Sequence, residues 1–417
     1  MFYYLYKEKL LISREKYNNN LKEISESEAK IYNGMIFALI SLSPELSRRS
    51  FSISHENFLF LEEEDLNLLV KPITPILILT IPQWLKDAIS SNRVTSLNTD
   101  YPNWEDVLTY KEPEKWRINV VGLGDVGGTL LTGLKLLGVE KIQSLGLYDK
   151  DINRVERYKF ELSQILSPDM KESSIDIISL KEDEVFNCDM FVFCVSVGVP
   201  PVVKEGVDVR LVQFDGNAKI LSHYATLARA KSFKGIFAVV SDPVDLLCKV
   251  AFTQSNTDSA SNMDFKGLAP EQIRGYGLGV MNARACYYAS QKASTKHYMQ
   301  EGRAFGPHGE GLIIADSIVN YNEVLSDALT HSTKTANLEV RSTGFKPYIA
   351  PALSSGSLSI LATINSQWHY SATFIGGTFM GCKNRLLPSG TQLETLDLNE
   401  VLLCKLNSTY KLLSEFI

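Results

Sequence analysis

A glycine-rich loop is the first feature of this sequence that points to chemistry. The apolar stretch Ile118–Leu123 runs into Gly122-Leu123-Gly124-Asp125-Val126-Gly127, which has the spacing GxGxxG. In such a loop the first glycine permits a tight turn, the second lets backbone approach a pyrophosphate, and the third lets the next helix pack on the strand. Backbone N–H groups at the start of that helix would face the phosphates. We therefore predict a dinucleotide site contacted by Gly122, Gly124, Asp125, Val126 and Gly127.

An acidic residue after the next apolar stretch narrows the choice of dinucleotide. Asp149 directly follows Ile142–Tyr148 and precedes Lys150. A carboxylate at this place accepts hydrogen bonds from the adenosine ribose and repels a 2′-phosphate. The sequence therefore predicts NAD rather than NADP, with Asp149 and Lys150 at the ribose. A glycine-rich turn that only packs two elements is the alternative.

One histidine is a candidate proton carrier. The six histidines of the chain are His55, His223, His297, His308, His331 and His369. Only His308 lies between glycines, in Gly306-Pro307-His308-Gly309, where a flexible backbone can aim the ring. An imidazole suits general acid/base work because its ordinary pKa is about 6.5. A surface histidine with no catalytic role is the alternative.

Short apolar runs alternate with helical patterns from Arg117 onward. The predicted strands are Ile118–Leu123, Ile142–Tyr148, Ile175–Leu180, Met190–Val195 and Gly235–Val240, and the predicted helices are Thr129–Leu137 and Asn153–Ile165. Continuously apolar strands separated by helices indicate a parallel sheet covered on both faces. We expect an α/β fold: a Rossmann doubly wound parallel sheet over residues 113–245, followed by an α+β substrate domain over residues 246–417.

Residues 1–112 differ from the rest and predict a small extra α+β domain. Its expected strands are Phe2–Tyr6, Asn57–Leu61 and Pro75–Thr80, with a helix from Glu26 to Leu42 that Ser25 or Ser27 would cap. The polar stretch Ser90–Asn103 and the run Lys111–Lys115 are expected to form a linker. We find no chemical motif in this segment.

Composition excludes several function classes. The chain has 417 residues, 45% of them hydrophobic, and a formal charge of −6, so it lacks the basic footprint of a nucleic-acid-binding protein. Its six cysteines form no CxxC pair, and we expect no metal site. No apolar run is long enough to span a bilayer, and the first residues do not resemble a signal peptide, so a cytoplasmic location is the expectation.

Several further motifs resemble the lactate/malate dehydrogenase family, over residues 117–417 and in the family's order. They are Val195–Pro200 with the loop Lys204–Asn217, Ser241–Asp245, Met281–Ala285 and Gly306–Glu310. Together with the glycine loop, this order is much more specific than any single motif.

The resemblance implies the roles of the site residues. Arg210 falls where the family keeps an arginine that polarises the substrate carbonyl, and Arg284 where an arginine clamps a substrate carboxylate. His308 falls on the catalytic histidine, and Val197, Gly198 and Asp242 on the nicotinamide side of the cofactor site. A helix-surface ion pair is the alternative for Arg284, and a brace or cap of a helix is the alternative for Arg210. The family also implies a small carboxylate-bearing substrate and a homo-oligomer, a dimer or tetramer.

Two departures from the family pattern bear on the chemistry. Met281 stands where an aspartate orients the catalytic histidine, so that the histidine needs another partner, for which Asp242 and Glu310 are both candidates. Asp242 itself replaces an asparagine. Lys346 is expected near the substrate pocket.

Three functions remain open from the sequence. The first is an NAD-dependent dehydrogenase of 2-hydroxy/2-oxo acids. The second is a dehydrogenase for a larger carbonyl derived from an amino acid or peptide. The third is an NAD-binding sensor or scaffold without turnover, because a fold alone does not carry activity.

Overall fold

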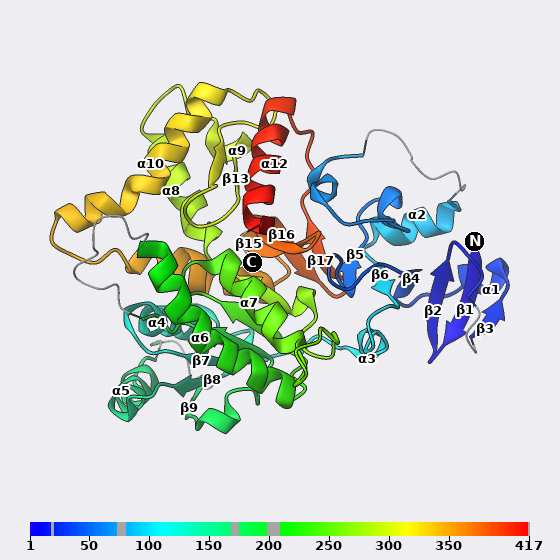
Figure 1. The fold of residues 1–417 in the computed structure, drawn as a ribbon, viewed down its shortest axis with the longest axis horizontal. Helices are drawn as coiled ribbons and strands as arrows, with labels where there is room; N and C mark the ends of the chain where they lie inside the picture. Colours follow the sequence, from blue (N-terminus) through cyan, green and yellow to red (C-terminus); the bar gives the residue numbers. More distant parts are fainter. Residues whose placement is uncertain (18–20, 73–80, 167, 169–174, 198–208, 416–417) are drawn as a thin grey trace.

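The computed structural model describes residues 1–17, 21–72, 81–166, 168, 175–197 and 209–415, with only the backbone described for 209–212 (Figure 1). Two large sheets organise the chain, one in the first quarter and one in the remainder. None of the helices in these ranges is long and apolar enough to cross a membrane.

The first sheet belongs to residues 1–110, here called the N-terminal unit. Its strands, in the spatial order β3-β1-β2-β4-β6-β5, are β1 (Phe2–Tyr6), β2 (Lys9–Ser13), β3 (Lys22–Ile24), β4 (Ile36–Ile40), β5 (Ser50–Ser52) and β6 (Val94–Asn98). Strands β2, β4 and β6 are parallel, and the remaining pairings are antiparallel. Helices α1 (Glu26–Lys30), α2 (Gln83–Ser90) and α3 (Asp106–Thr109) and the 3-10 turns η1 (Glu56–Phe58) and η2 (Leu66–Leu69) complete the unit.

Three sequence predictions fail in the N-terminal unit. Ser25 caps α1 as expected, but the helix ends at Lys30, and Ile36–Ile40 is strand β4. All five residues of β4 are buried, and a run apolar on both faces suits a central strand better than a helix with one apolar face. Residues 57–61 hold the end of η1 rather than a strand, and the predicted linker contains the buried strand β6. The predicted strand at residues 75–80 lies outside the described residues.

The second sheet has nine strands, in the order β17-β16-β15-β12-β11-β10-β7-β8-β9. The parallel strands are β7 (Trp116–Val121), β8 (Ile142–Tyr148), β9 (Asp176–Ser179), β10 (Met190–Phe193), β11 (Ile236–Val239) and β12 (Ile273–Gly275). Their order, counted from the first strand in the chain, is 3-2-1-4-5-6, as in a doubly wound Rossmann sheet. The predicted α/β fold class is therefore confirmed. The antiparallel strands β15 (His369–Ile375), β16 (Thr378–Leu387) and β17 (Gly390–Leu393) extend the sheet.

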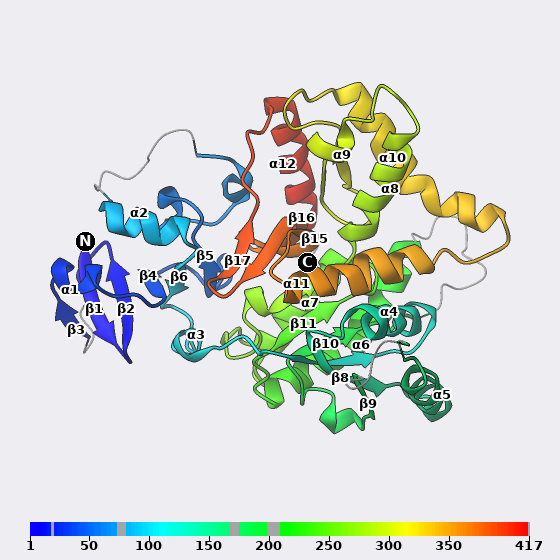
Figure 2. The same cartoon turned by 180° about the vertical axis from the view of Figure 1, so that it is seen from behind.

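Helices cover both faces of this sheet (Figures 1 and 2). They are α4 (Asp125–Leu137), α5 (Ile152–Ser163), α6 (Val209–Ala230), α7 (Val244–Asn256), the π-helical η5 (Pro351–Ser357) and α11 (Leu358–Ile364), with 3-10 turns η3 (Glu182–Glu184) and η4 (Pro270–Gln272). A further layer holds α8 (Leu278–Ser290), α9 (Tyr298–Glu301), the pair β13 (Arg303–Phe305) and β14 (Ile313–Ala315), α10 (Glu323–Ser342) and α12 (Glu400–Glu415). Gly133 of α4 lies against Ser357 of η5, so η5 packs on the helix that follows the glycine loop.

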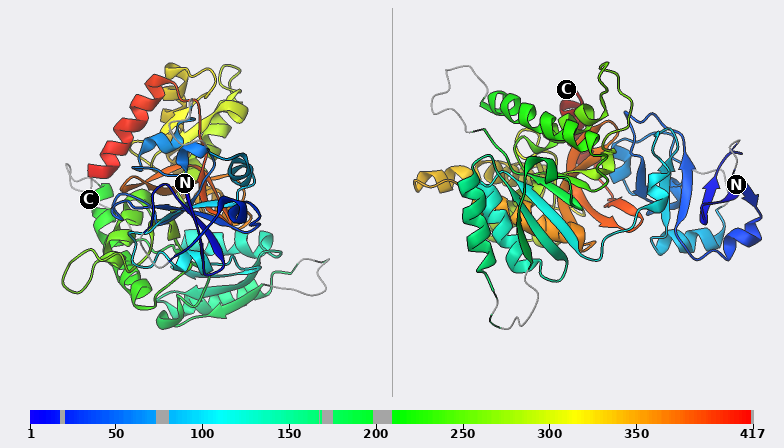
Figure 3. Two further views of the ribbon diagram at one scale, coloured as in Figure 1. Left: turned by 90° about the vertical axis from the view of Figure 1, so that its right-hand side faces the viewer. Right: turned by 90° about the horizontal axis from the view of Figure 1, so that it is seen from below.

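The N-terminal unit packs at one end of the nine-stranded sheet, beyond β17 (Figure 3). One apolar core runs across the contact, because Leu10 and Phe51 share a cluster with Met380 and Leu406. Polar contacts reinforce it: the Arg49 guanidinium meets the carboxylate of Glu271 at 3.0 Å. The unit is therefore built into the main body rather than tethered to it. The domain boundaries at residues 112/113 and 245/246 stay predictions.

Candidate active site

The glycine loop joins β7 to α4. Gly122 has a φ of 93°, and a Cβ there would stand 2.7 Å from the backbone nitrogen of Val195. A Cβ on Gly127 would stand 2.0 Å from the carbonyl oxygen of Gly122. A Cβ on Gly124, in contrast, would meet nothing within 4 Å. The chain's own packing thus requires the first and third glycines, and the second faces open space of the kind that a pyrophosphate needs.

Asp149 fixes the shape of this loop. Its carboxylate accepts N–H bonds from Leu123 at 2.7 Å and from Asp151 at 2.9 Å. Its side chain is only 14% exposed, and each carboxylate oxygen has a second lone pair. The Asp149 carboxylate can therefore still accept the predicted hydrogen bonds from the ribose hydroxyls. Lys150 beside it is exposed, and Val126 in the first turn of α4 is half-buried.

Asp125 begins α4, where its negative charge suits the positive end of the helix dipole. Its carboxylate lies 3.4 Å from the ammonium of Lys346. Lys346, expected near the substrate pocket, is thus placed at the glycine loop. The pairing offsets the negative charge that Asp125 brings to a phosphate site.

A buried amide links the ends of the two strands that flank the site. The backbone N–H of Val197, after β10, donates to Asn217 Oδ1 at 2.8 Å. Asn217 Nδ2 in turn donates to the carbonyl oxygen of Asp242, after β11, at 2.7 Å. Asn217 is fully buried on α6, and the Asp242–Pro243 peptide bond is cis. From the sequence, Asn217 marked only the end of a loop, and no role was predicted for it.

His308 has a carboxylate partner. Its Nδ1 lies 2.7 Å from Asp242 Oδ1, and the two side chains are 17% and 45% exposed. A carboxylate accepts only an N–H donor, so this contact selects the tautomer with the proton on Nδ1. No described residue is within hydrogen-bonding distance of Nε2, which is left for a ligand. Of the two candidates for the missing partner, Asp242 makes the contact, while Glu310 pairs with Lys334.

Arg284 lies on α8, one turn after Met281. Its Nη1 is 3.7 Å from the Met281 sulfur, a weak acceptor, and Met281 is buried in an apolar cluster. No described carboxylate is within ion-pair distance of this guanidinium. Burial lowers the pKa of Arg284, while the nearby Tyr288 and Asp242 act in the opposite direction. A half-buried cation that forms no direct ion pair is well suited to bind an anion.

A buried carboxyl group, that of Asp245, lies near the His308–Asp242 pair, and no role was predicted for it from the sequence. Asp245, in the first turn of α7, is 4% exposed, and its Oδ1 has no hydrogen-bond partner among the described residues. Burial, with a smaller contribution from the charge of Asp242, raises the pKa of Asp245 to about 7. Hydrogen bonds from the backbone N–H groups of Asp245 and Gly381 and the charge of His308 act in the opposite direction. Asp245 therefore holds a proton through much of the acid range.

The structure thus brings three predicted residues together: Asp242 contacts His308 and also interacts by charge with Arg284. Arg210 belongs to the first turn of α6, but its side chain lies outside the described residues, as does all of Gly198. No cluster of three or more histidine, cysteine or acidic side chains in the described ranges could hold a metal.

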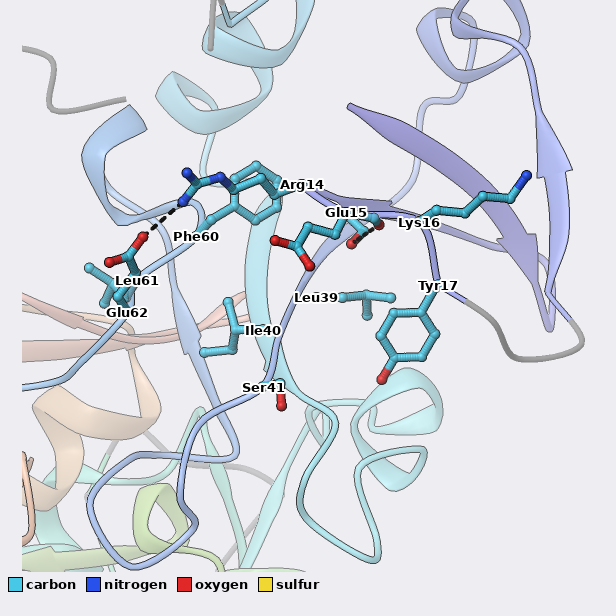
Figure 4. A pocket seen from close by; sticks show the side chains of 11 residues that line it. Arg14, Glu15, Lys16, Tyr17, Leu39, Ile40, Ser41, Phe60, Leu61 and Glu62 are labelled. Atoms are coloured by element: carbon cyan, nitrogen blue, oxygen red, sulfur yellow. Dashed lines mark hydrogen bonds and ion pairs between the residues drawn. The ribbon is translucent and has the colours of Figure 1, made fainter. Parts of the chain in front are cut away.

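The N-terminal unit also has a cavity, of about 570 Å³, where β2 and β4 end (Figure 4). Arg14 reaches across it to Glu62 at 2.9 Å, while Tyr17 and Ser41 lie at the opposite side. Both partners of this ion pair are exposed, so water screens them. The cavity has no histidine or cysteine in its lining and no counterpart of the His308 constellation.

Comparison with known proteins finds a similarity to lactate/malate dehydrogenases over part of the chain. Residues 116–264 match the model of the lactate/malate dehydrogenase NAD-binding domain. The L-lactate dehydrogenase of Mycoplasma pneumoniae is 26% identical over 143 residues, 34% of this chain and 41% of that protein. The malate dehydrogenase of Sulfurisphaera tokodaii is 25% identical over 207 residues, 49% of this chain and 60% of that protein. The chain thus spans about half the length of the curated relatives it matches.

Solved structures extend the likeness of the fold. A lactate dehydrogenase from a Medee basin deep-sea metagenome library superposes with a TM-score of 0.60 at 20% identity, over 72% of this chain and 97% of that chain. The minor L-lactate dehydrogenase of Enterococcus mundtii gives 0.59 at 18% identity over the same shares. The protein is therefore one with an NAD-binding Rossmann domain, and NAD is its cofactor. Residues 116–264 are thus similar to the NAD-binding domain of the lactate/malate dehydrogenases, and the N-terminal unit lies outside this match.

Proposed function

We propose that this protein is an NAD-dependent dehydrogenase that interconverts a 2-hydroxy acid and the corresponding 2-oxo acid. The observation that carries the proposal is the His308–Asp242 pair together with Arg284, a cation that feels the charge of Asp242 but forms no direct ion pair with a described carboxylate. A proton carrier with a free nitrogen and a cation for a carboxylate are the two groups that this reaction requires from a protein.

Each side chain has a separate task in this reaction. Bound NAD supplies or accepts the hydride at the carbon that bears the oxygen. Arg284 holds the substrate carboxylate by paired N–H bonds. His308 Nε2 gives a proton to the oxygen during reduction and takes it back during oxidation. Asp242 acts through His308, because it keeps the proton on Nδ1 and stabilises the imidazolium form. We assign Arg210 to the carbonyl oxygen by resemblance to the family.

The carboxylate of Asp242 can replace the orienting aspartate that is absent at position 281, where this chain has methionine. In the family pattern described above, the orienting acid stands on the helix that carries the clamp arginine. Here that helix carries Met281 in an apolar cluster, and the acid comes from the loop after β11. The substitution of asparagine by Asp242 and the loss of the aspartate at 281 therefore compensate each other in charge. This argument supports turnover over the NAD-binding sensor.

The test is turnover with a defined panel. NADH oxidation is followed with pyruvate, oxaloacetate, and branched and aromatic 2-oxo acids as substrates. We expect at least one to turn over, and His308→Gln to lower kcat by two to four orders of magnitude, the range of general acid/base catalysis. His331→Gln, at an exposed histidine of α10, is the matched control. Tight NADH binding without turnover on any acid would favour the sensor, and an unchanged rate in His308→Gln would remove the proposed proton carrier.

A further inference from the structure

A second cavity lies at the junction of the N-terminal unit with the nine-stranded sheet. Its volume is about 380 Å³, and its lining includes Phe37 of β4, Val107 of α3, Ile236 of β11 and Leu387 of β16. Helix α3 stands beside this junction in Figures 1 and 2. Ile236 begins β11, whereas Asp242 follows its end, so the cavity opens at the opposite edge of the sheet from His308. Cavities of this size between domains commonly hold small molecules.

The charged groups that line the cavity do not balance. Four of these groups form two ion pairs within the lining: Arg49 with Glu271 at 3.0 Å, and Lys234 with Asp106. Lys9 of β2 also lines the cavity, and no described carboxylate is within ion-pair distance of it. The lining therefore carries one cation in excess.

A buried guanidinium adds to this positive charge. Arg274 of β12 is 1% exposed, and its Nη2 donates to the hydroxyl of Thr391, which lines the cavity, at 2.5 Å. Its other polar partner is the amide oxygen of Asn384 at 2.9 Å, and its Nε has no partner among the described residues. Burial lowers the pKa of Arg274, and the charge of Arg48 acts in the same direction. An uncompensated buried cation behind the wall makes the cavity favourable for an anion.

We propose that this junction cavity binds a small organic anion with an apolar body, such as an aromatic or branched carboxylate. The aromatic and aliphatic lining takes the body, and the excess positive charge of Lys9 and Arg274 selects the anionic group. Because the lining comes from both sheets, the ligand stabilises the contact between the N-terminal unit and the main body.

A fluorescent probe tests the proposal on the full chain saturated with NADH. The anion 1-anilinonaphthalene-8-sulfonate is titrated against the protein, and N-phenyl-1-naphthylamine, which has the same rings without the sulfonate, is the matched neutral probe. We expect one saturable site that survives NADH and prefers the anion. Lys9→Gln should weaken anion binding about fivefold, as for the loss of one partly screened charge, and Lys30→Gln, an exposed lysine of α1 away from the cavity, should not.

A filling variant gives a second, independent readout. Val107→Trp should abolish the site, with folding checked by circular dichroism, and Lys9→Gln keeps the test valid if that variant does not fold. Complete displacement of the anion by NADH would overturn the proposal, because the probe would then occupy the dinucleotide site. Equal binding of both probes, or an equal effect of Lys9→Gln and Lys30→Gln, would overturn it as well. Turnover of 2-oxo acids is unaffected by any of these outcomes, so this proposal and the proposed function fail separately.

Discussion

Asp242→Asn tests the most specific claim about the active site, that a carboxylate at this position serves His308. Asparagine keeps the shape and can still accept the Nδ1–H with its amide oxygen, so the variant removes the charge and little else. A hydrogen bond to a charged group contributes about 1.5–3 kcal/mol. Asp242 is 45% exposed, so water screens part of this, and we take about 1.5–2 kcal/mol.

That energy corresponds to a loss of about 10- to 30-fold in kcat/KM, since each 1.36 kcal/mol is a factor of ten. In the serine-protease triad, where the aspartate is buried, the same exchange costs about 10⁴ in kcat. That larger loss arises because the histidine takes the wrong tautomer. A smaller loss is expected here if the asparagine oxygen still accepts the Nδ1–H, because Asp242 is also 45% exposed.

The assay is NADH-dependent reduction of the best 2-oxo acid, with Asp183→Asn, which removes a charge from exposed η3, as the control. The NADH dissociation constant is measured in parallel. We expect kcat to fall and NADH affinity to hold within about twofold. Equal rates in the two variants would refute the reasoning. A loss confined to NADH affinity would instead assign Asp242 to the cofactor, as the sequence alone predicted.

Three further predictions concern the cofactor loop and the acids around the site. Gly127→Ala should lose NADH binding in a fluorescence titration, because its Cβ would stand 2.0 Å from the oxygen of Gly122; unchanged affinity would contradict the loop assignment. Burial raises the pKa of Asp245 to about 7, so the stability that this group contributes is present below about pH 4 and is lost as the pH rises to 7. The melting temperature of Asp245→Asn relative to the parent should therefore increase from pH 5 to pH 8 in calorimetry, and a constant difference would exclude an ionising Asp245. Adding Met281→Asp to Asp242→Asn should recover part of the lost kcat/KM, and no recovery in a folded double variant would show that position 281 cannot reach the histidine.

The cofactor loop could be predicted from sequence because its signals are local. The glycines, the strand before them and Asp149 lie within one βαβ segment, and each has a steric or charge requirement that the structure displays. The strands of the Rossmann sheet could also be predicted from local signals, because a continuously apolar run indicates a strand that is buried on both faces.

The partner of His308 could not be predicted in this way. Asp242 and His308 are 66 residues apart, and only the folded chain shows which of two candidate acids makes the contact. Asp245 ended a motif that the sequence matched to the family, but its burial could not be predicted, because a carboxylate at a helix start is also favourable at the surface. Strand β4 was wrongly predicted as helix, because five apolar residues after a well-capped turn carry no periodicity that separates the two structures.

The apolar core shared between the N-terminal unit and the main body has a consequence for the history of this chain. A family member that began near Trp116 would leave Met380 and Leu406 without the side chains that now cover them. Once such residues had changed to suit their new neighbours, removal of the added segment would cost the whole protein its stability. The N-terminal unit is thus part of what keeps the main body folded, whatever its other role.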